Sequence, residues 1–529
     1  MKSFKPTGPG ALLTAVILMG GVLRFIYLGR ESIWFDEALS DWFSSLPMDK
    51  LWREAPGYET HPPLFYTMLK VWKAIFGNSE AALRSFAAMA GTMTIPLVYL
   101  LGRVAGGQAK GQVMGLAAAA IFALAPIHIA YGQDARPYTF LVFFATLGLL
   151  GALWLAANPM QAARPYMGLA GPAGPEAAGP VKLAWAALIL GTALSLWLHN
   201  MGFTLAAALV ATTAAGLLWK TGFSRAYMIN AALAAALILL IYSPFIPWFA
   251  RQVGNVHTSF WQKPINIGLI GEGLSYVFFL FMSPFWIKGL MMALAGYGLA
   301  MIHRQRGALV SATLAGAMLI PFLIEISLSY LFTPIYVART MIWASVPFYV
   351  LVAGALAGDG KPVIKVALVA LVAAGLVQGD LARFRHKKEP WREMVALVAS
   401  KAKAGDTALI IPNSAAIAFS YYTTRMNVDL KLIPLPAPFP AIGLDRPYPS
   451  GNTAEPAFTW ADAHLLDGLD CENQSIWLVT WFRTRFDPEM VAFKKLSEKC
   501  QMVESGGYPS LHVIHFARKT GDENVEPGR

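Results

Sequence analysis

The sequence predicts a polytopic α-helical membrane protein of about eleven transmembrane helices, with a small soluble α/β domain at its C-terminal end. Of its 529 residues, 56% are hydrophobic and only 14% are charged, and the mean hydropathy is +0.49. Apolar runs close to the length needed to cross a bilayer recur up to Asp380. Beyond Asp380, short strand-like runs alternate with amphipathic helical patterns. We therefore expect a transmembrane module over residues 1–380 and a soluble domain over residues 381–529.

About eleven apolar segments are long enough to be transmembrane helices. The first lacks a small-residue cleavage site followed by a polar region, so it predicts a retained helix rather than a signal peptide. The shorter segment Pro62–Phe76 carries two lysines, which favours a helix lying on the outer surface within a long loop over residues 30–83. The predicted spans run near residues 10–29, 84–102, 111–131, 138–157, 183–199, 201–219, 226–246, 286–302, 308–328, 340–357 and 363–380.

The distribution of basic residues predicts the orientation of these spans. Lys2 and Lys5 precede the first span and predict a cytoplasmic N-terminus, and an odd number of spans then places the soluble domain outside. Most basic loops fall on the predicted cytoplasmic side, as does a Pro/Gly/Ala-rich linker over 158–180, whereas the run from Arg383 to Arg392 does not. The net charge of +11 therefore reflects topology and contact with anionic membrane lipids, and nucleic acid is not an expected partner.

The soluble domain is predicted to combine short strands with helices. Its two cysteines, Cys471 and Cys500, are the only ones in the chain. They either form a disulfide, which an oxidising compartment outside the membrane would permit, or remain two buried thiols. The expected strands cover residues 406–412, 429–435, 475–481 and 511–516, and the expected helices cover residues 390–404 and 488–500.

Charged and polar side chains gather at the ends of several spans on the predicted outer side. Singly, each has an ordinary explanation: an arginine can extend to lipid headgroups, and a histidine can cap the carbonyls of a helix end. Those explanations do not predict that carboxylates, histidines and arginines from distant segments fall at one membrane surface. Such a gathering indicates a cavity that binds an anion and moves a proton. The residues concerned are Asp36, Glu37, Asp41, Glu59, His61, Asp134, Arg136, Tyr138, His199 and Arg339.

Several motifs among these residues occur together in one family of membrane enzymes. These motifs are Trp34-x-Asp36-Glu37, His61-Pro62-Pro63-Leu64-Phe65-Tyr66, Phe76-Gly77 with Arg84, Tyr131-x-Gln133-x-Ala135-Arg136-Pro137-Tyr138 and Lys388-x-x-Trp391-Arg392-Glu393. The matches are dense toward the N-terminal end and sparse after the fifth span. With these motifs the sequence resembles the polytopic GT-C glycosyltransferases, specifically the branch containing protein O-mannosyltransferases and the lipid A aminoarabinose transferase.

The resemblance implies an inverting glycosyltransferase that moves a sugar from a polyprenyl-phosphate donor to a hydroxyl of a protein, lipid A or glycan acceptor. It implies action at the outer face of a bacterial inner membrane. Asp36 and Glu37 would be the catalytic acid pair, with Asp36 as the general base that deprotonates the acceptor hydroxyl. The implied donor-phosphate ligands are Arg136, Arg339, His61 and Lys388, and the implied substrate-cavity residues are Asp134, Tyr138, His199, Tyr66 and Glu59.

One departure from the family pattern concerns a metal ion. Thr60-His61 stands where the aminoarabinose transferase has Glu-Lys before its two prolines, so the carboxylate of that position is missing here. His61 and His199 could still hold a divalent cation, and Glu59 is the nearest carboxylate in the sequence. No other cofactor is indicated by the sequence.

Two other classes of membrane protein remain as alternatives. A lipid or sugar transporter or flippase would also be polytopic, and Glu325 within the ninth span is the residue that best fits it. A transporter is expected to show charge near mid-span and paired repeats, whereas here the charge collects at span ends. A transferase similar to an O-antigen ligase would share the outer cavity and the lipid donor.

Overall fold

The computed structural model describes residues 8–163, 175–222, 224–258, 262, 264–280, 283–442, 444, 455–472 and 474–519. Lys2, Lys5 and the centre of the predicted 158–180 linker lie outside these residues. The chain divides into two compact units. The first, here called the helical unit, comprises Met1–Leu28, Thr60–Arg251 and Gln262–His386, and the second, the sheet unit, comprises Gly29–Glu59, Gln252–Trp261 and Lys387–Arg529.

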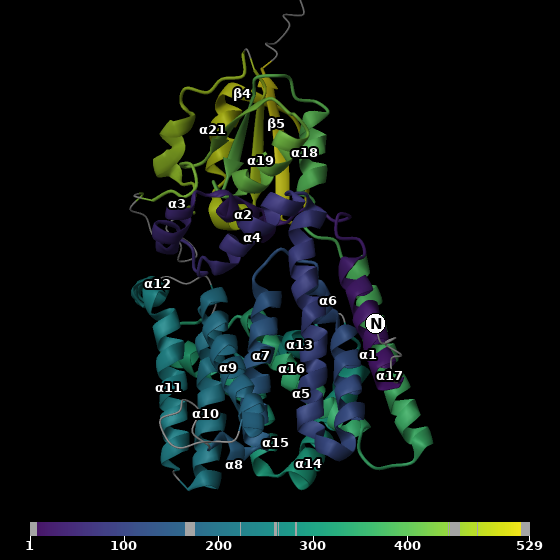
Figure 1. The fold of residues 1–529 in the computed structure, drawn as a ribbon. Helices are drawn as coiled ribbons and strands as arrows, with labels where there is room; N and C mark the ends of the chain where they lie inside the picture. The colour runs from purple at the N-terminus through teal and green to yellow at the C-terminus, as the bar shows by residue number, and fades with distance from the viewer. Residues whose placement is uncertain are drawn as a thin grey trace, which may run out of the picture. The chain divides into compact units, whose positions relative to one another are not determined.

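The helical unit is a bundle of apolar helices that run side by side (Figure 1). Every residue of α16 is buried, which makes this helix the centre of the bundle. The elements are α1 (Gly8–Phe25), α4 (Leu64–Phe76), α5 (Glu80–Ala123), α6 (Pro126–Gly132), α7 (Tyr138–Ala157), α8 (Pro159–Ala162), α9 (Pro175–Leu198), α10 (Gly202–Thr221), α11 (Arg225–Tyr242), η2 (Ser243–Phe245), α12 (Ile246–Thr258), α13 (Ile267–Phe279), α14 (Phe285–Arg306), α15 (Ala308–Leu331), η3 (Ala338–Ala344), α16 (Ser345–Leu356) and α17 (Pro362–Arg385); the last residues of α12 belong to the sheet unit.

The helix α5 contains two spans rather than one. Its 44 residues would extend for about 66 Å, roughly twice the thickness of a hydrocarbon core. It is broken at Gly107, whose φ of +64° lies in the left-handed region that favours glycine. The arms fold back on each other so closely that a Cβ at Gly102 would lie 2.8 Å from the Cα of Gly115. The described residues contain 10 helices long and apolar enough to cross a membrane, so with α5 counted twice the predicted number of spans is confirmed.

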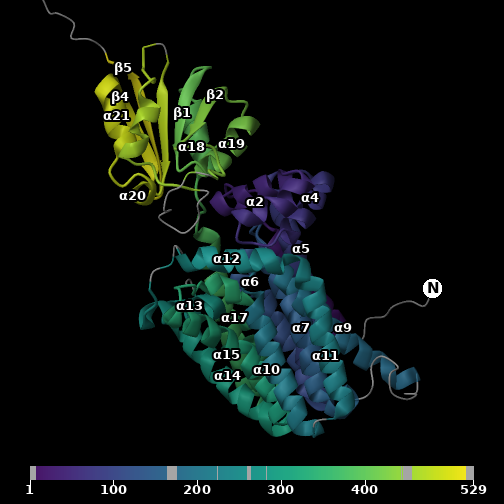
Figure 2. The same cartoon turned by 90° about the vertical axis from the view of Figure 1, so that its left-hand side faces the viewer.

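The sheet unit is built on a five-stranded sheet in the order β2-β1-β3-β5-β4. The strand β1 is parallel to β2 and β3, whereas β5 is antiparallel to β3 and β4. Helices pack on the sheet (Figure 2), which confirms the predicted α/β architecture. The elements are β1 (Asp406–Ile411), β2 (Leu430–Pro434), β3 (Ile476–Trp481), β4 (Cys500–Tyr508), β5 (Leu511–Arg518), α18 (Trp391–Ala399), α19 (Ala415–Arg425), η4 (Trp460–Leu466), α20 (Arg483–Phe486) and α21 (Val491–Lys499).

The core on one side of this sheet joins strands, α21 and η4. Leu409, Leu478 and Phe516 of the strands pack with Leu466 of η4 and Leu496 of α21. Cys471 and Cys500 form a disulfide in the same core, so of the two alternatives for the cysteines the disulfide is the one present. It closes a loop of 29 residues, which by chain entropy stabilises the unit by roughly 3–4 kcal/mol.

The sheet unit also contains a segment from far upstream, Gly29–Glu59. It forms α2 (Phe35–Ser45), α3 (Met48–Arg53) and η1 (Ala55–Gly57). Phe35 stacks on Trp481, the last residue of β3, with ring centroids 4.2 Å apart. Trp42 packs on Phe439, in the loop that follows β2. The segment therefore lies at the carboxyl ends of the parallel strands, the edge at which open α/β sheets bind their ligands.

Candidate active site

Asp36 occupies the first turn of α2, and Glu37 follows it. Asp36 is partly exposed, whereas Glu37 is fully buried. Carboxylates in the first turn of a helix interact favourably with the positive end of the helix dipole. Glu37 Oε2 also accepts a hydrogen bond of 3.3 Å from the backbone N–H of Trp34, the residue that precedes the helix. Two adjacent carboxylates thus have different environments, and only Asp36 is accessible from outside the unit.

Lys388 lies against the buried carboxylate. Its Nζ donates to Glu37 Oε1 at 3.0 Å and lies 6.0 Å from the ring centroid of Trp34. Because both charges are mostly withdrawn from water, each compensates the burial cost of the other. The structure thus brings together three of the predicted site residues, Asp36, Glu37 and Lys388, within the sheet unit.

Glu389 joins Asp36, Glu37 and Lys388 in what is here called the acidic group, and the sequence analysis missed it. Its Oε2 accepts hydrogen bonds from the backbone N–H of Phe35 at 3.1 Å and from Trp391 Nε1 at 2.8 Å. Its Oε1 accepts from Trp481 Nε1 at 3.0 Å. Burial raises the pKa of Glu389, with a smaller contribution from the negative charge of Asp36, while the three donors act in the opposite direction. The one signal in the sequence was its position beside Lys388, within the motif that opens the soluble domain.

A second group of predicted residues, here called the basic group, meets in the helical unit. His61 precedes α4, Arg136 lies between α6 and α7, and His199 follows α9. Arg136 Nη2 lies 3.5 Å from His61 Nε2, and the rings of His61 and His199 are perpendicular with centroids 4.8 Å apart. The ring centroid of Tyr138, the first residue of α7, lies 5.8 Å from that of His199. Three helix ends far apart in the sequence therefore converge on one place within the helical unit.

The surroundings of His199 show the sign of the potential in this group. Burial holds the pKa of His199 well below its usual value, and the positive charges of His61, Arg136 and Arg339 lower it further. Both effects favour the neutral ring. Its Nδ1 accepts a hydrogen bond of 3.0 Å from the backbone N–H of Met201, so the proton of the neutral ring is on Nε2. His199 can thus donate a hydrogen bond to an anion without carrying a charge itself.

Arg339 stands at the start of η3 and is positioned by a buried acid. Thr340 Oγ1 donates to Glu325 Oε1 at 3.0 Å and lies 2.8 Å from the carbonyl oxygen of Val337. Glu325 is fully buried in α15. This contact joins η3, which carries Arg339, to α15 through Oε1 of Glu325, whereas Oε2 is buried with no hydrogen-bond partner among the described residues.

The remaining predicted residues fall in both units. Asp134 and Tyr66 are buried in the helical unit, where the N–H of Arg136 donates to the carbonyl of Asp134 at 2.7 Å. Glu59 belongs to the sheet unit, where its carbonyl accepts from Gln252 Nε2 at 2.6 Å.

The structure gives the candidate metal site of His61 and His199 no third ligand among the residues that it describes. Among the residues that the structure describes, no three histidines, cysteines or carboxylates lie close enough together to hold a metal ion. Two imidazoles alone do not make up the three or four protein ligands typical of a zinc site. The residues present do not fit a bound metal, and no chemical step is assigned to one.

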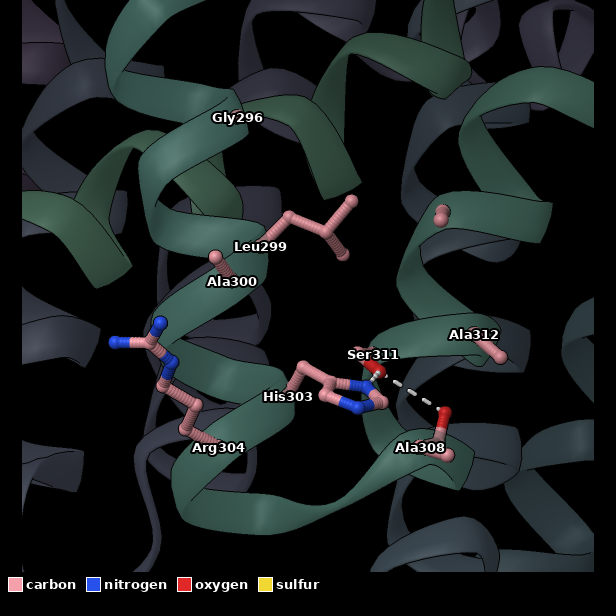
Figure 3. A pocket seen from close by; sticks show the side chains of 9 residues that line it. Gly296, Leu299, Ala300, His303, Arg304, Ala308, Ser311 and Ala312 are labelled. Atoms are coloured by element: carbon pink, nitrogen blue, oxygen red, sulfur yellow. Dashed lines mark hydrogen bonds between the residues drawn. The ribbon is translucent and has the colours of Figure 1, made fainter.

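A separate cavity lies between α14 and α15 (Figure 3). Its volume is 510 Å³, and its polar lining includes His303 and Ser311, whose Nδ1 and Oγ atoms are 3.1 Å apart. None of the predicted site residues lines this cavity.

Part of the chain matches a known family. Residues 60–173 match the family described as dolichyl-phosphate-mannose-protein mannosyltransferase. This stretch contains His61, Tyr66, Asp134, Arg136 and Tyr138. Among curated protein sequences, no match to the chain was found.

Solved structures share the fold over nearly the whole chain. ArnT from Cupriavidus metallidurans in the apo state gives a TM-score of 0.61 at 14% identity, over 96% of this chain and 97% of that one. The same protein bound to undecaprenyl phosphate gives 0.59 at 15% identity, with the same coverage of both chains. An Archaeoglobus fulgidus oligosaccharyltransferase in complex with Zn and sulfate gives 0.51 at 14% identity, over 89% of this chain and 68% of that one. The resemblance to the GT-C glycosyltransferases is thereby confirmed, and the chain has their fold.

Proposed function

We propose that this protein is an inverting glycosyltransferase that moves a sugar from a polyprenyl-phosphate donor to an acceptor hydroxyl. The observation that carries the proposal is the convergence of His61, Arg136 and His199 from three helix ends. Two of these residues lie in the stretch that matches the mannosyltransferase family. The solved ArnT structure with bound undecaprenyl phosphate supports a polyprenyl phosphate as the donor carrier.

Asp36 is the general base of the proposed reaction. A hydroxyl is almost wholly protonated at neutral pH, and a positioned base typically accelerates its attack by about 10²–10⁴-fold. The deprotonated oxygen forms a bond to the anomeric carbon as the bond from that carbon to the phosphate oxygen breaks, which inverts the configuration. Asp36 suits this role because its carboxylate is partly exposed, whereas that of Glu37 is buried and paired.

The basic group binds the donor phosphate in this proposal. Charge grows on the phosphate as it leaves, and fixed donors that meet this charge lower the barrier. Arg136 and Arg339 supply charge-assisted hydrogen bonds, and His61 and the Nε2–H of His199 add further donors. Asp134, Tyr138, Tyr66 and Glu59 remain proposed residues of the substrate cavity.

The protein is a multi-pass membrane protein, and we place it in a bacterial inner membrane with the N-terminus cytoplasmic. The basic loops support this orientation, which puts the sheet unit outside. Acceptors accessible there are protein, lipid A and glycan hydroxyls. Against the transporter alternative, Glu325 Oε1 accepts a hydrogen bond from Thr340 within the bundle, and the predicted site residues lie at helix ends rather than at mid-span.

The proposal can be tested by replacing Asp36 with Asn in the native host. Asparagine keeps the shape of the side chain but cannot take the proton, so the donor lipid is expected to accumulate while a surface glycan, lipid or protein loses a sugar. Mass spectrometry of membrane lipids and envelope glycans measures both. Asp49→Asn, at an exposed carboxylate in the first turn of α3, is the matched control. Unchanged lipids and glycans despite normal amounts of the Asp36→Asn protein would contradict the proposal.

A further inference from the structure

We propose that Glu37, Lys388 and Glu389 are positioning residues by which the C-terminal part of the sheet unit holds the base Asp36 in place. The inference rests on the proposed function for the role of Asp36. It assigns the C-terminal domain a part in the reaction, and it gives Glu37 and Lys388 roles other than acid catalysis and phosphate binding.

The first support is the ion pair on the residue next to the base. Glu37 has no exposed surface, and its partner Lys388 lies 351 positions away in the sequence. Glu37 uses both oxygens locally: Oε1 accepts from Lys388 and Oε2 from the N–H of Trp34. A lysine engaged in this way neutralises the buried carboxylate, and its loss leaves an uncompensated charge beside Asp36.

The second support is Glu389, which binds the backbone of the base segment itself. Its carboxylate joins the N–H of Phe35, the residue before Asp36, to the indoles of Trp391 and Trp481. Trp481 ends β3 and also stacks on Phe35. The start of α2 is therefore fixed to the sheet through one carboxylate and one aromatic stack.

The third support is the preceding loop, whose backbone is bound by α18 and α19. The N–H of Ile33 donates to Tyr422 Oη at 2.6 Å, and the N–H of Arg392 donates to Ser32 Oγ at 2.9 Å. The Arg392 guanidinium donates to the carbonyls of Gly29 and Arg30 at 3.3 and 3.2 Å. An exposed loop is ordinarily mobile, whereas this one is held at successive residues up to the base.

Such fastening matters because proton abstraction depends on geometry. A displacement of about 1 Å in a reacting group can lower the rate about 100-fold. If these residues position Asp36, removing their contacts is expected to lower kcat and to leave the KM for the donor unchanged. A role of Lys388 in phosphate binding predicts instead a higher KM for the donor.

The experiment compares Lys388→Met, Lys388→Arg, Glu37→Gln/Lys388→Met and the control Lys401→Met. Lys401 forms an ion pair with Glu504 in the same unit and is not among the residues that hold the segment around Asp36. The probe is the donor lipid extracted from the Asp36→Asn strain, and released polyprenyl phosphate is measured with the purified full chain. Amide exchange over residues 29–45 is measured on the same proteins.

Positioning predicts that Lys388→Met lowers kcat about 100-fold, with donor KM within about twofold and amide exchange over 29–45 accelerated about tenfold. The double variant, which buries no unpaired charge, is expected to recover about tenfold of the loss, and Lys388→Arg most of it. The control stays at wild-type values. The proposal is overturned if Lys388→Met raises KM about tenfold at unchanged kcat, or if the double variant does no better than the single one.

A second pair of variants tests Glu389. Glu389→Gln retains one acceptor oxygen for three donors, so kcat is expected to fall while donor KM is unchanged. The matched control is Glu489→Gln, because Glu489 accepts from the indole of Trp460 at 2.8 Å at an exposed place. If the wild-type protein releases no polyprenyl phosphate, the proposed function fails, and the amide exchange of these variants still decides the positioning role.

Discussion

The acidic group of the sheet unit and the basic group of the helical unit differ in how their charges are balanced. In the acidic group, Lys388 neutralises Glu37, and Glu389 accepts from three N–H donors. In the basic group, the charges that act on His199 come from His61, Arg136 and Arg339 and all have the same sign. The first arrangement is suited to hold a side chain still, and the second to receive an anion.

The largest expected effect tests the basic group. Arg136→Met removes a cation beside His61, so polyprenyl-phosphate binding and sugar transfer are each expected to fall by about 10²–10³-fold. Arg136→Lys is expected to recover only part of this loss, because lysine lacks the planar fork of arginine. Undecaprenyl phosphate titrated onto the purified protein provides the binding measurement.

The control for this change is Arg103→Met, because Arg103 is an exposed arginine of α5 that packs on Tyr99 and lies outside the basic group. If Arg136→Met and Arg103→Met weakened undecaprenyl-phosphate binding equally, the basic group would not be the specific anion site that this comparison assigns to it. Binding that survives Arg136→Met would assign the anion to other residues.

A smaller effect separates the stability of the two units. Replacing Cys471 and Cys500 by alanine removes the disulfide, which is expected to lower the free energy of unfolding of the sheet unit by roughly 3–4 kcal/mol. Undecaprenyl-phosphate binding is expected to remain, since the basic group belongs to the helical unit. The loss of stability is measured by thermal unfolding, followed by near-UV circular dichroism, of the proteins with and without the disulfide. If the variant without the disulfide failed to bind undecaprenyl phosphate at temperatures where its sheet unit is still folded, lipid binding would depend on the sheet unit as well, contrary to this expectation.

The smallest effect concerns pH. The folded state holds the pKa of His199 below its unfolded value near 6.5, so the unfolded chain binds this proton more readily. Stability is therefore expected to fall as pH decreases from about 6.5 toward the folded pKa, and to be independent of His199 above that range. Unfolding temperatures measured between pH 5 and 8 should show a shallower acid slope for His199→Gln than for the wild type. An unchanged slope would mean that burial and the positive neighbours do not lower the pKa of His199 in the folded state.

Much of the fold follows from local sequence patterns. Apolar length alone predicts the spans, including 84–102, which lies in the first arm of α5, and 111–131, which covers most of the second arm together with α6. Alternating or continuous apolar runs predict β1, β2, β3 and β5. The strand β4 was missed because it lies at the edge of the sheet, is mostly exposed and contains Gly506 and Gly507, so no apolar alternation marks it. The helix α19 was missed as well.

The sequence proposes the members of the candidate site, but several of the contacts that the structure shows could not be predicted from it. The motifs around Asp36, His61 and Arg136 identify residues beside span ends, where polar groups are unusual. The role of Glu389 was not predictable, because its contact with Phe35 joins positions 354 residues apart and neither residue is unusual locally. The pairing of Lys388 with Glu37 was not predictable either. The sequence shows a run of basic residues around Lys388, but only the fold determines which carboxylate Lys388 pairs with.

The central claim is that Asp36 is the base of a transfer from a polyprenyl-phosphate sugar, and one rate measurement tests it most directly. Purified wild-type and Asp36→Asn proteins are given the lipid that accumulates in the variant strain, together with acceptor-containing membranes, and the released polyprenyl phosphate is timed. We predict release by the wild type and a rate at least about 10²-fold lower for Asp36→Asn, with undecaprenyl-phosphate binding unchanged. Equal rates for the two proteins would contradict the account.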